Sequence, residues 1–87
     1  MQNLDSQKII NRFFQALYAL KEKKIIRGKH TFVTKHEINP RNFYRLEKDM
    51  SRDMFQTAWL SYLVEDYGIS PSWLLTGCGD MFIKKQQ

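Results

Sequence analysis

The chain has little cysteine, proline or glycine: one, two and four residues among 87. One cysteine cannot form an internal disulfide, so packing must supply the stability, as in proteins of the reducing cytoplasm. No run of about 18 apolar residues is present and residues 1–6 lack a secretory signal, so neither a membrane span nor export is expected. With 43% hydrophobic and 14% aromatic residues, the chain also lies outside the disordered and collagen-like classes.

An enzyme is not expected either. A chain of 87 residues holds one small core, with little room for a deep cleft, an organic cofactor or a small-molecule substrate. The adjacent carboxylates Glu65 and Asp66 would point in different directions on a helix. The spacing of His30, His36 and Cys78 does not suit a zinc site, so no metal is expected.

The first third of the chain has the apolar period of helices. A helix with Ser6 as its N-cap is predicted to bury six residues and to place Lys8, Arg12 and Gln15 on its polar side. The six residues are Ile9, Ile10, Phe13, Phe14, Leu17 and Leu20. A second, shorter helix is expected from about residue 29 to residue 36, with Phe32 and Val33 buried.

Two dipeptides, Asn39-Pro40 and Ser70-Pro71, carry a helix start signal, because a short polar side chain caps free amides and proline suits the first helical position. They predict a helix over 40–49 and a short closing turn over 70–77. Between them, an apolar helix over 55–67 is expected to be central and to end at Gly68.

Residues 79–87 show no helical period and are expected to be extended or mobile, with 81–83 a possible short strand in a partner interface. These elements together predict an all-α fold, a compact five-helix bundle, with residues 1–87 forming one domain.

The charge of the chain is positive and unevenly distributed. The net charge is +5, and residues 21–48 carry nine basic and three acidic side chains, a local balance of +6. This charge alone is compatible with two explanations: an ordinary solvated surface, or a surface that binds a polyanionic partner.

The predicted helix over 40–49 has two opposite faces. Phe43, Leu46 and Met50 share an apolar face, while Arg41, Arg45 and Lys48 lie on nearly the opposite side, flanked by Asn42 and Tyr44. The connection of residues 37–39 is short, which forces a steep crossing with the helix before it. Such a helix fits a DNA major groove about 12 Å wide, where arginine matches the acceptors of guanine.

Two segments resemble the phage-repressor-like (lambda-repressor-like) helix-turn-helix family: residues 32–47, FVTKHEINPRNFYRLE, and residues 68–77, GISPSWLLTG. The resemblance covers residues 8–80 and places the helix-turn-helix at about 29–49. It implies a double-stranded DNA-binding transcriptional regulator, a repressor of a phage or mobile element, acting as a homodimer in the bacterial cytoplasm and associated with the nucleoid.

The resemblance also assigns roles to residues that match the family's positions. Arg41, Asn42 and Arg45 would contact bases, and Lys29, Asn39, Tyr44 and Lys48 would contact phosphates, although Tyr44 could instead cover the core edge. Glu47 matches an acidic position that pairs with a basic residue of the first helix; because the matching position is Glu22, Lys21 or Lys23 would substitute.

Three residues depart from the family pattern. Val33 replaces a small residue where the two helices approach each other, and Pro40 replaces a base-reading side chain. Glu37 replaces the turn glycine, so it either adopts a left-handed conformation or the turn differs.

Two functions from different classes therefore stay open. The first is a homodimeric regulator on a palindromic operator, with a dimer contact suggested at Trp73, Met81 and Phe82 by their apolar character, and with a possible regulatory protein partner. The second is a protein-interaction module, antitoxin-like or adaptor, which presents Tyr44 and the basic face to an acidic protein.

Overall fold

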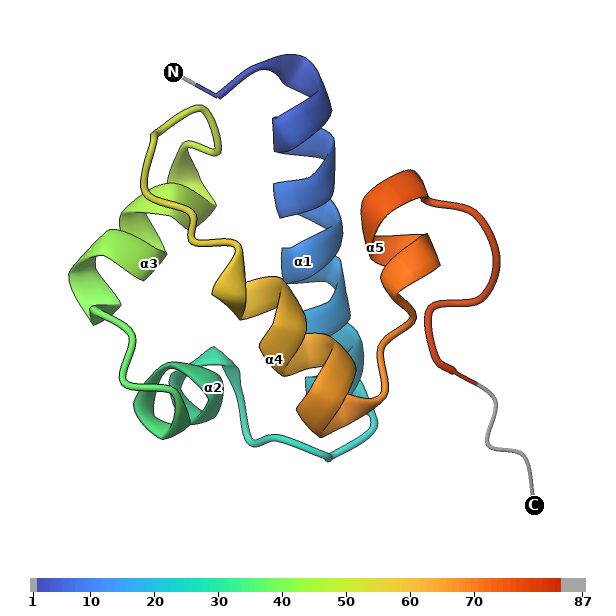
Figure 1. The fold of residues 1–87 in the computed structure, drawn as a ribbon. Helices are drawn as coiled ribbons and strands as arrows, with labels where there is room; N and C mark the ends of the chain where they lie inside the picture. The colour runs from blue at the N-terminus through green and yellow to red at the C-terminus, as the bar shows by residue number, and fades with distance from the viewer. Residues whose placement is uncertain (1, 84–87) are drawn as a thin grey trace.

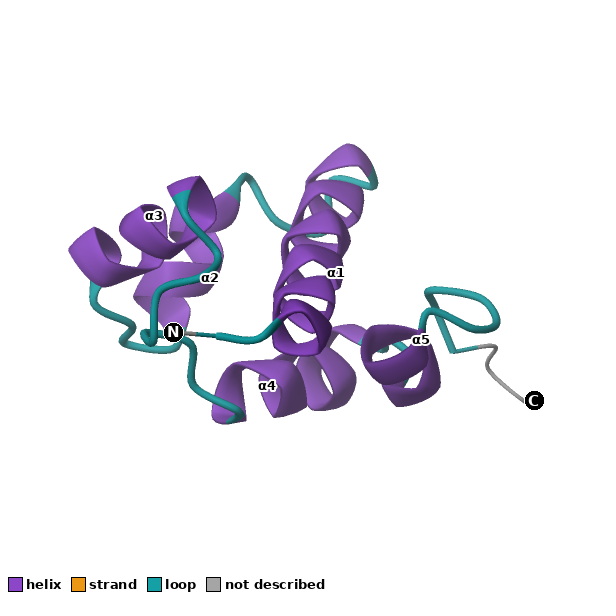
Figure 2. Cartoon of the chain, turned by 90° about the horizontal axis from the view of Figure 1, so that it is seen from above, coloured by secondary structure: helices purple, strands orange, loops and turns teal. Residues whose placement is uncertain are grey.

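A computed structural model describes residues 2–83 as five α-helices and one isolated β-bridge (Figure 1). Helix α1 (Leu4–Glu22) runs through the middle of the molecule. The pair α2 (Lys29–Lys35) and α3 (Pro40–Lys48) lies on one side of α1 and α5 (Pro71–Thr76) on the other, while α4 (Ala58–Tyr67) crosses α1 between them (Figure 2). The predicted all-α fold of five helices is confirmed. Among the described residues, no helix is long and apolar enough to cross a membrane.

Helix α1 begins earlier than the sequence predicts. Its N-cap is Asn3, whose side-chain oxygen accepts a hydrogen bond of 2.7 Å from the backbone N–H of Ser6. Ser6 was predicted as the cap and is instead the third helical residue. Both residue types cap helices well, and the chain uses the one that adds another turn to the helix.

The core is built around the ring of Phe13 on α1. Its centroid lies 5.1–6.1 Å from those of five neighbouring rings, four of them in edge-to-face geometry. The neighbours are Phe14, Phe32, Phe43, Phe55 and Trp59. Because these rings come from α1, α2, α3, α4 and the segment before α4, one aromatic cluster ties most of the fold together.

Helix α4 is less central than its apolar sequence predicts. It starts at Ala58, so Phe55 lies in the preceding loop, and only Trp59 and Leu63 are buried on it. Leu60 and Val64 are only half-buried and pack against the edge of the core. Its predicted end is confirmed: Gly68 adopts a left-handed conformation with φ 71°.

Helix α5 is held against α1 by an arginine. Arg12 Nε donates a 2.7 Å hydrogen bond to the carbonyl of Leu74, and its Nη2 donates one of 3.0 Å to that of Leu75. These bonds satisfy carbonyls at the end of α5, and they correct the prediction that Arg12 lies on the solvent side. At Gly77, with φ 78°, a Cβ would lie 3.3 Å from Arg12 Nη1, so glycine suits both the conformation and the close approach.

The segment after α5 folds back onto its own chain. The backbone N–H of Ser70 donates to the carbonyl of Met81 at 2.7 Å, and that of Ile83 donates to the carbonyl of Gly68 at 2.9 Å. Residues 81–83 are therefore extended, as predicted, and Phe82 forms an antiparallel bridge with Ile69 of the same chain. The rest of the predicted tail, 84–87, lies outside the described residues.

Candidate nucleic-acid interface

Helix α3 presents a basic face to solvent. Its N-cap Asn39 accepts a hydrogen bond of 3.1 Å from the N–H of Asn42, and Pro40 occupies the first turn, as the sequence predicts. Phe43 and Leu46 are fully buried on one side of the helix. Arg41, Arg45 and Lys48 are exposed on the other side, and none of them forms an ion pair within residues 2–83.

The connection between α2 and α3 is fixed by backbone hydrogen bonds. The N–H of His36 donates to Phe32 at 3.1 Å, that of Glu37 to Thr34 at 3.3 Å, and that of Ile38 to Val33 at 3.0 Å. Ile38 is also buried. The orientation of α3 relative to α2 is therefore set by an ordered turn.

Glu37 adopts the left-handed conformation, with φ 55°, at the turn position where the resemblance implies glycine. We predict that Glu37→Gly stabilises the protein by up to about 1 kcal/mol, because the left-handed penalty of about 1–2 kcal/mol exceeds the extra chain entropy of glycine. Urea unfolding measures this change. The control Gln15→Gly, at an exposed position in the middle of α1, should instead cost about 0.5–1 kcal/mol. An unchanged or lower stability of Glu37→Gly would show that the side chain itself contributes to the turn.

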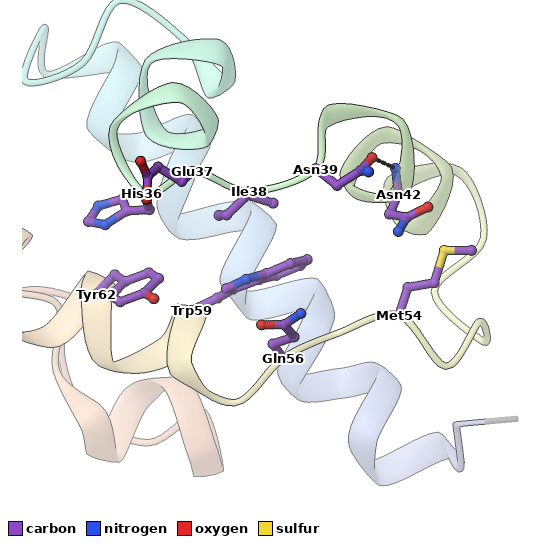
Figure 3. Close-up of a pocket in the computed structure, with 9 residues that line it drawn as sticks. All are labelled: His36, Glu37, Ile38, Asn39, Asn42, Met54, Gln56, Trp59 and Tyr62. Carbon is purple, nitrogen blue, oxygen red and sulfur yellow. Dashed lines mark hydrogen bonds between the residues drawn. The ribbon is translucent and has the colours of Figure 1, made fainter.

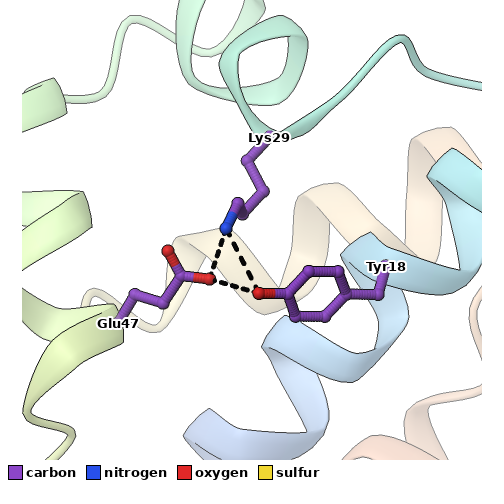
Figure 4. Close-up of polar contacts among 3 residues, drawn as sticks. All are labelled: Tyr18, Lys29 and Glu47. Carbon is purple, nitrogen blue, oxygen red and sulfur yellow. Dashed lines mark hydrogen bonds and ion pairs between the residues drawn. The ribbon is translucent and has the colours of Figure 1, made fainter.

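Lys29, at the start of α2, is held by two side chains from other helices (Figure 4). Its Nζ lies 2.5 Å from Glu47 Oε2 on α3 and 3.3 Å from the hydroxyl of Tyr18 on α1, and that hydroxyl donates to the same carboxylate oxygen at 2.8 Å. Burial favours a lower pKa for Lys29, but these hydrogen bonds outweigh it and raise the pKa.

This contact corrects the predicted partner of Glu47. The partner is Lys29 rather than Lys21 or Lys23, because the first residue of α2 lies within ion-pair distance of α3 (Figure 4). Lys29 was also predicted to bind phosphate. Its side chain is one quarter exposed, so a phosphate would have to share the ammonium group with Glu47.

The other predicted contact residues lie around the basic face. Asn39 is exposed, and its side-chain oxygen is used by the helix cap, which leaves its amide for a phosphate. Tyr44 is half-buried, with its ring against Phe43 at 5.3 Å, so it covers the core edge while part of it reaches the surface. The structure thus brings Lys29, Asn39, Asn42 and Tyr44 to the same helix pair as the exposed arginines.

The predicted dimer residues Trp73, Met81 and Phe82 are half-buried and pack against the chain's own core. Phe82 is also covered by Lys23, whose Nζ lies 4.4 Å from the ring centroid. These contacts leave only part of each side chain for another copy.

Beside the turn lies a cavity of about 250 Å³ (Figure 3). His36, Asn39, Asn42, Gln56, Trp59 and Tyr62 are among the residues that line it. The ring of His36 stacks on Tyr62, with centroids 4.2 Å apart and planes 8° apart. Its Nε2 is buried without a hydrogen bond, 3.6 Å from Asp66 Oδ2. The His36 ring therefore packs the turn after α2 against α4.

Burial lowers the pKa of His36 below 6.5; the nearby Asp66 acts in the opposite direction and Lys35 adds to the lowering. A folded-state pKa below the unfolded one means that the unfolded chain binds more protons, so this contribution to stability is present above pH 6.5 and is lost as the pH falls. We predict that the free energy of unfolding decreases between about pH 7 and pH 5 and that His36→Gln flattens this decrease. Urea unfolding at several pH values tests this, with His30→Gln, at the exposed histidine, as the control. An equally steep profile in His36→Gln would contradict the assignment.

Among residues 2–83, no group of three or more His, Cys, Asp or Glu side chains is placed to hold a metal ion. Comparison of the chain with protein-family models, curated proteins and solved structures finds no match.

Proposed function

We propose that the protein binds double-stranded DNA sequence-specifically as a transcriptional regulator, with α2 and α3 acting as a helix-turn-helix and α3 entering the major groove. The observation that carries the proposal is the exposed face of Arg41, Arg45 and Lys48, which has no ion-pair partner in residues 2–83 and lies opposite the buried Phe43 and Leu46. A helix anchored on one side and cationic on the other suits a groove that admits one helix.

The predicted residue roles follow the same geometry. Arg41 and Arg45 lie one turn apart and offer donor forks to base edges, with Asn42 beside them. The residues around this face would contact phosphates: Lys48, Asn39, Tyr44 and Lys29. A phosphate at Lys29 would share the ammonium group with Glu47. The proposed protein is a homodimeric repressor on a palindromic site in the bacterial cytoplasm.

Selection of duplexes from a random pool, followed by fluorescence anisotropy between about 50 and 200 mM salt, tests the proposal. We expect an enriched palindrome and an affinity that falls by about the 0.9 power of salt concentration per neutralised phosphate. No enrichment together with no salt dependence would refute it.

A protein-interaction module is the second candidate. The observation that favours it is the neutralisation of Lys29 by Glu47, which weakens one predicted phosphate contact. A module of this kind would enrich no duplex sequence from the random pool, which separates the two functions in the same experiment.

A further inference from the structure

Two neighbouring apolar hollows lie along α4. One, of about 230 Å³, is formed with the first part of α1 and with Phe55; Ile9 and Ile10 are among its lining residues. The other, of about 260 Å³, is formed with α5, by residues that include Val64, Leu74 and Leu75. Thr57 and Leu60 line both hollows, so Leu60 stands between them.

The two hollows contain no charged side chain. The chain has 14 Lys plus Arg and 9 Asp plus Glu, yet the remaining lining residues are Gln2, Ser6, Ser61 and Pro71. Leu60 and Val64 are half-buried and Leu75 is 52% exposed, so apolar surface faces water here. Apolar surface exposed to water is the kind of surface through which proteins associate.

We infer that this α4 face, defined by the two hollows and Leu60, binds the same face of a second copy of the chain. A two-fold contact requires a self-complementary surface, and a side chain between two hollows provides one, because Leu60 of each copy can enter a hollow of the other. Each copy carries a net charge of +5, so like-charge repulsion opposes a contact between two copies least at a face without charged side chains. This face has none.

The inference deepens the proposed function, because a palindromic DNA site requires two copies of the protein. Both hollows are lined by residues of α1, α4, α5 and the segments before α1 and α4, and by none of α2 or α3, so a second copy there leaves the basic face of α3 uncovered. It differs from the dimer contact that the sequence suggested at Trp73, Met81 and Phe82.

Sedimentation equilibrium of the 87-residue chain without DNA tests the inference. We expect a monomer–dimer equilibrium in the unaltered protein, weakened at least about tenfold by Ser61→Arg. Ser61 is exposed and lines one hollow, so the substitution places like charges at the contact while the core stays intact. The control Gln15→Arg adds the same charge on α1, on the side of Tyr18, and should leave dimerisation unchanged.

A second variant, Leu75→Arg at a half-exposed position, should weaken the dimer as Ser61→Arg does. Circular dichroism of each variant confirms folding. A monomer at every concentration, equal effects of Ser61→Arg and Gln15→Arg, or a dimer lost only with Met81→Arg would each overturn the inference. Because no DNA is present, these outcomes are independent of the DNA-binding test, and Arg41→Ala/Arg45→Ala should still dimerise.

Discussion

Phe13→Ala should lower the free energy of unfolding by about 3–5 kcal/mol, the usual cost of removing a buried phenyl ring. The ring is fully buried, and rings from four other segments of the chain pack around it, so its loss leaves a cavity that no single neighbour can fill. A small domain has only about 5–15 kcal/mol of stability in total. The variant should therefore be partly unfolded at moderate temperature.

Urea unfolding followed by circular dichroism measures this loss. Leu4→Ala, at a side chain that is 75% exposed on the same helix, provides the control and should change stability by no more than about 0.5 kcal/mol. A cost below about 1 kcal/mol for Phe13→Ala would mean that the aromatic cluster collapses around the vacancy, in conflict with a tightly packed core.

The ends of several helices could be predicted from the sequence. Asn39 and Ser70 cap their helices with side-chain oxygens, and Gly68 and Gly77 end theirs in the left-handed conformation, because each effect depends on a few neighbouring residues. The predicted start of α1 was wrong. Asn3 and Ser6 are both good N-caps, and the choice between them depends on tertiary packing.

The exposed basic face of α3 was also predictable, since helical periodicity places Arg41 and Arg45 opposite Phe43. Contacts between distant segments were not. Arg12 reaches the end of α5, 62 residues away in sequence, and no pattern in the chain marks that pairing. The pairing of Glu47 with Lys29 differs from the family pattern, which places the basic partner on the first helix, whereas Lys29 begins the second.

Arg41→Ala/Arg45→Ala should reduce affinity for the selected duplex at least about 30-fold, because each bidentate arginine contact to a base contributes about 1–3 kcal/mol. Both side chains are exposed and form no ion pair within residues 2–83, so the free energy of unfolding should change little. Binding to unselected DNA should persist with reduced strength, since phosphate contacts carry most of the non-specific affinity.

Two matched variants separate base reading from charge. Lys8→Ala/Lys21→Ala removes the same two charges from exposed positions on α1 and should weaken binding far less. Lys48→Ala, on α3 itself, should weaken binding to all sequences about equally and reduce the salt slope by about 1. If Arg41→Ala/Arg45→Ala behaved like Lys48→Ala, lowering affinity without relaxing sequence preference, both arginines would be phosphate contacts, and base reading would have to come from Asn42 or from the shape of the DNA.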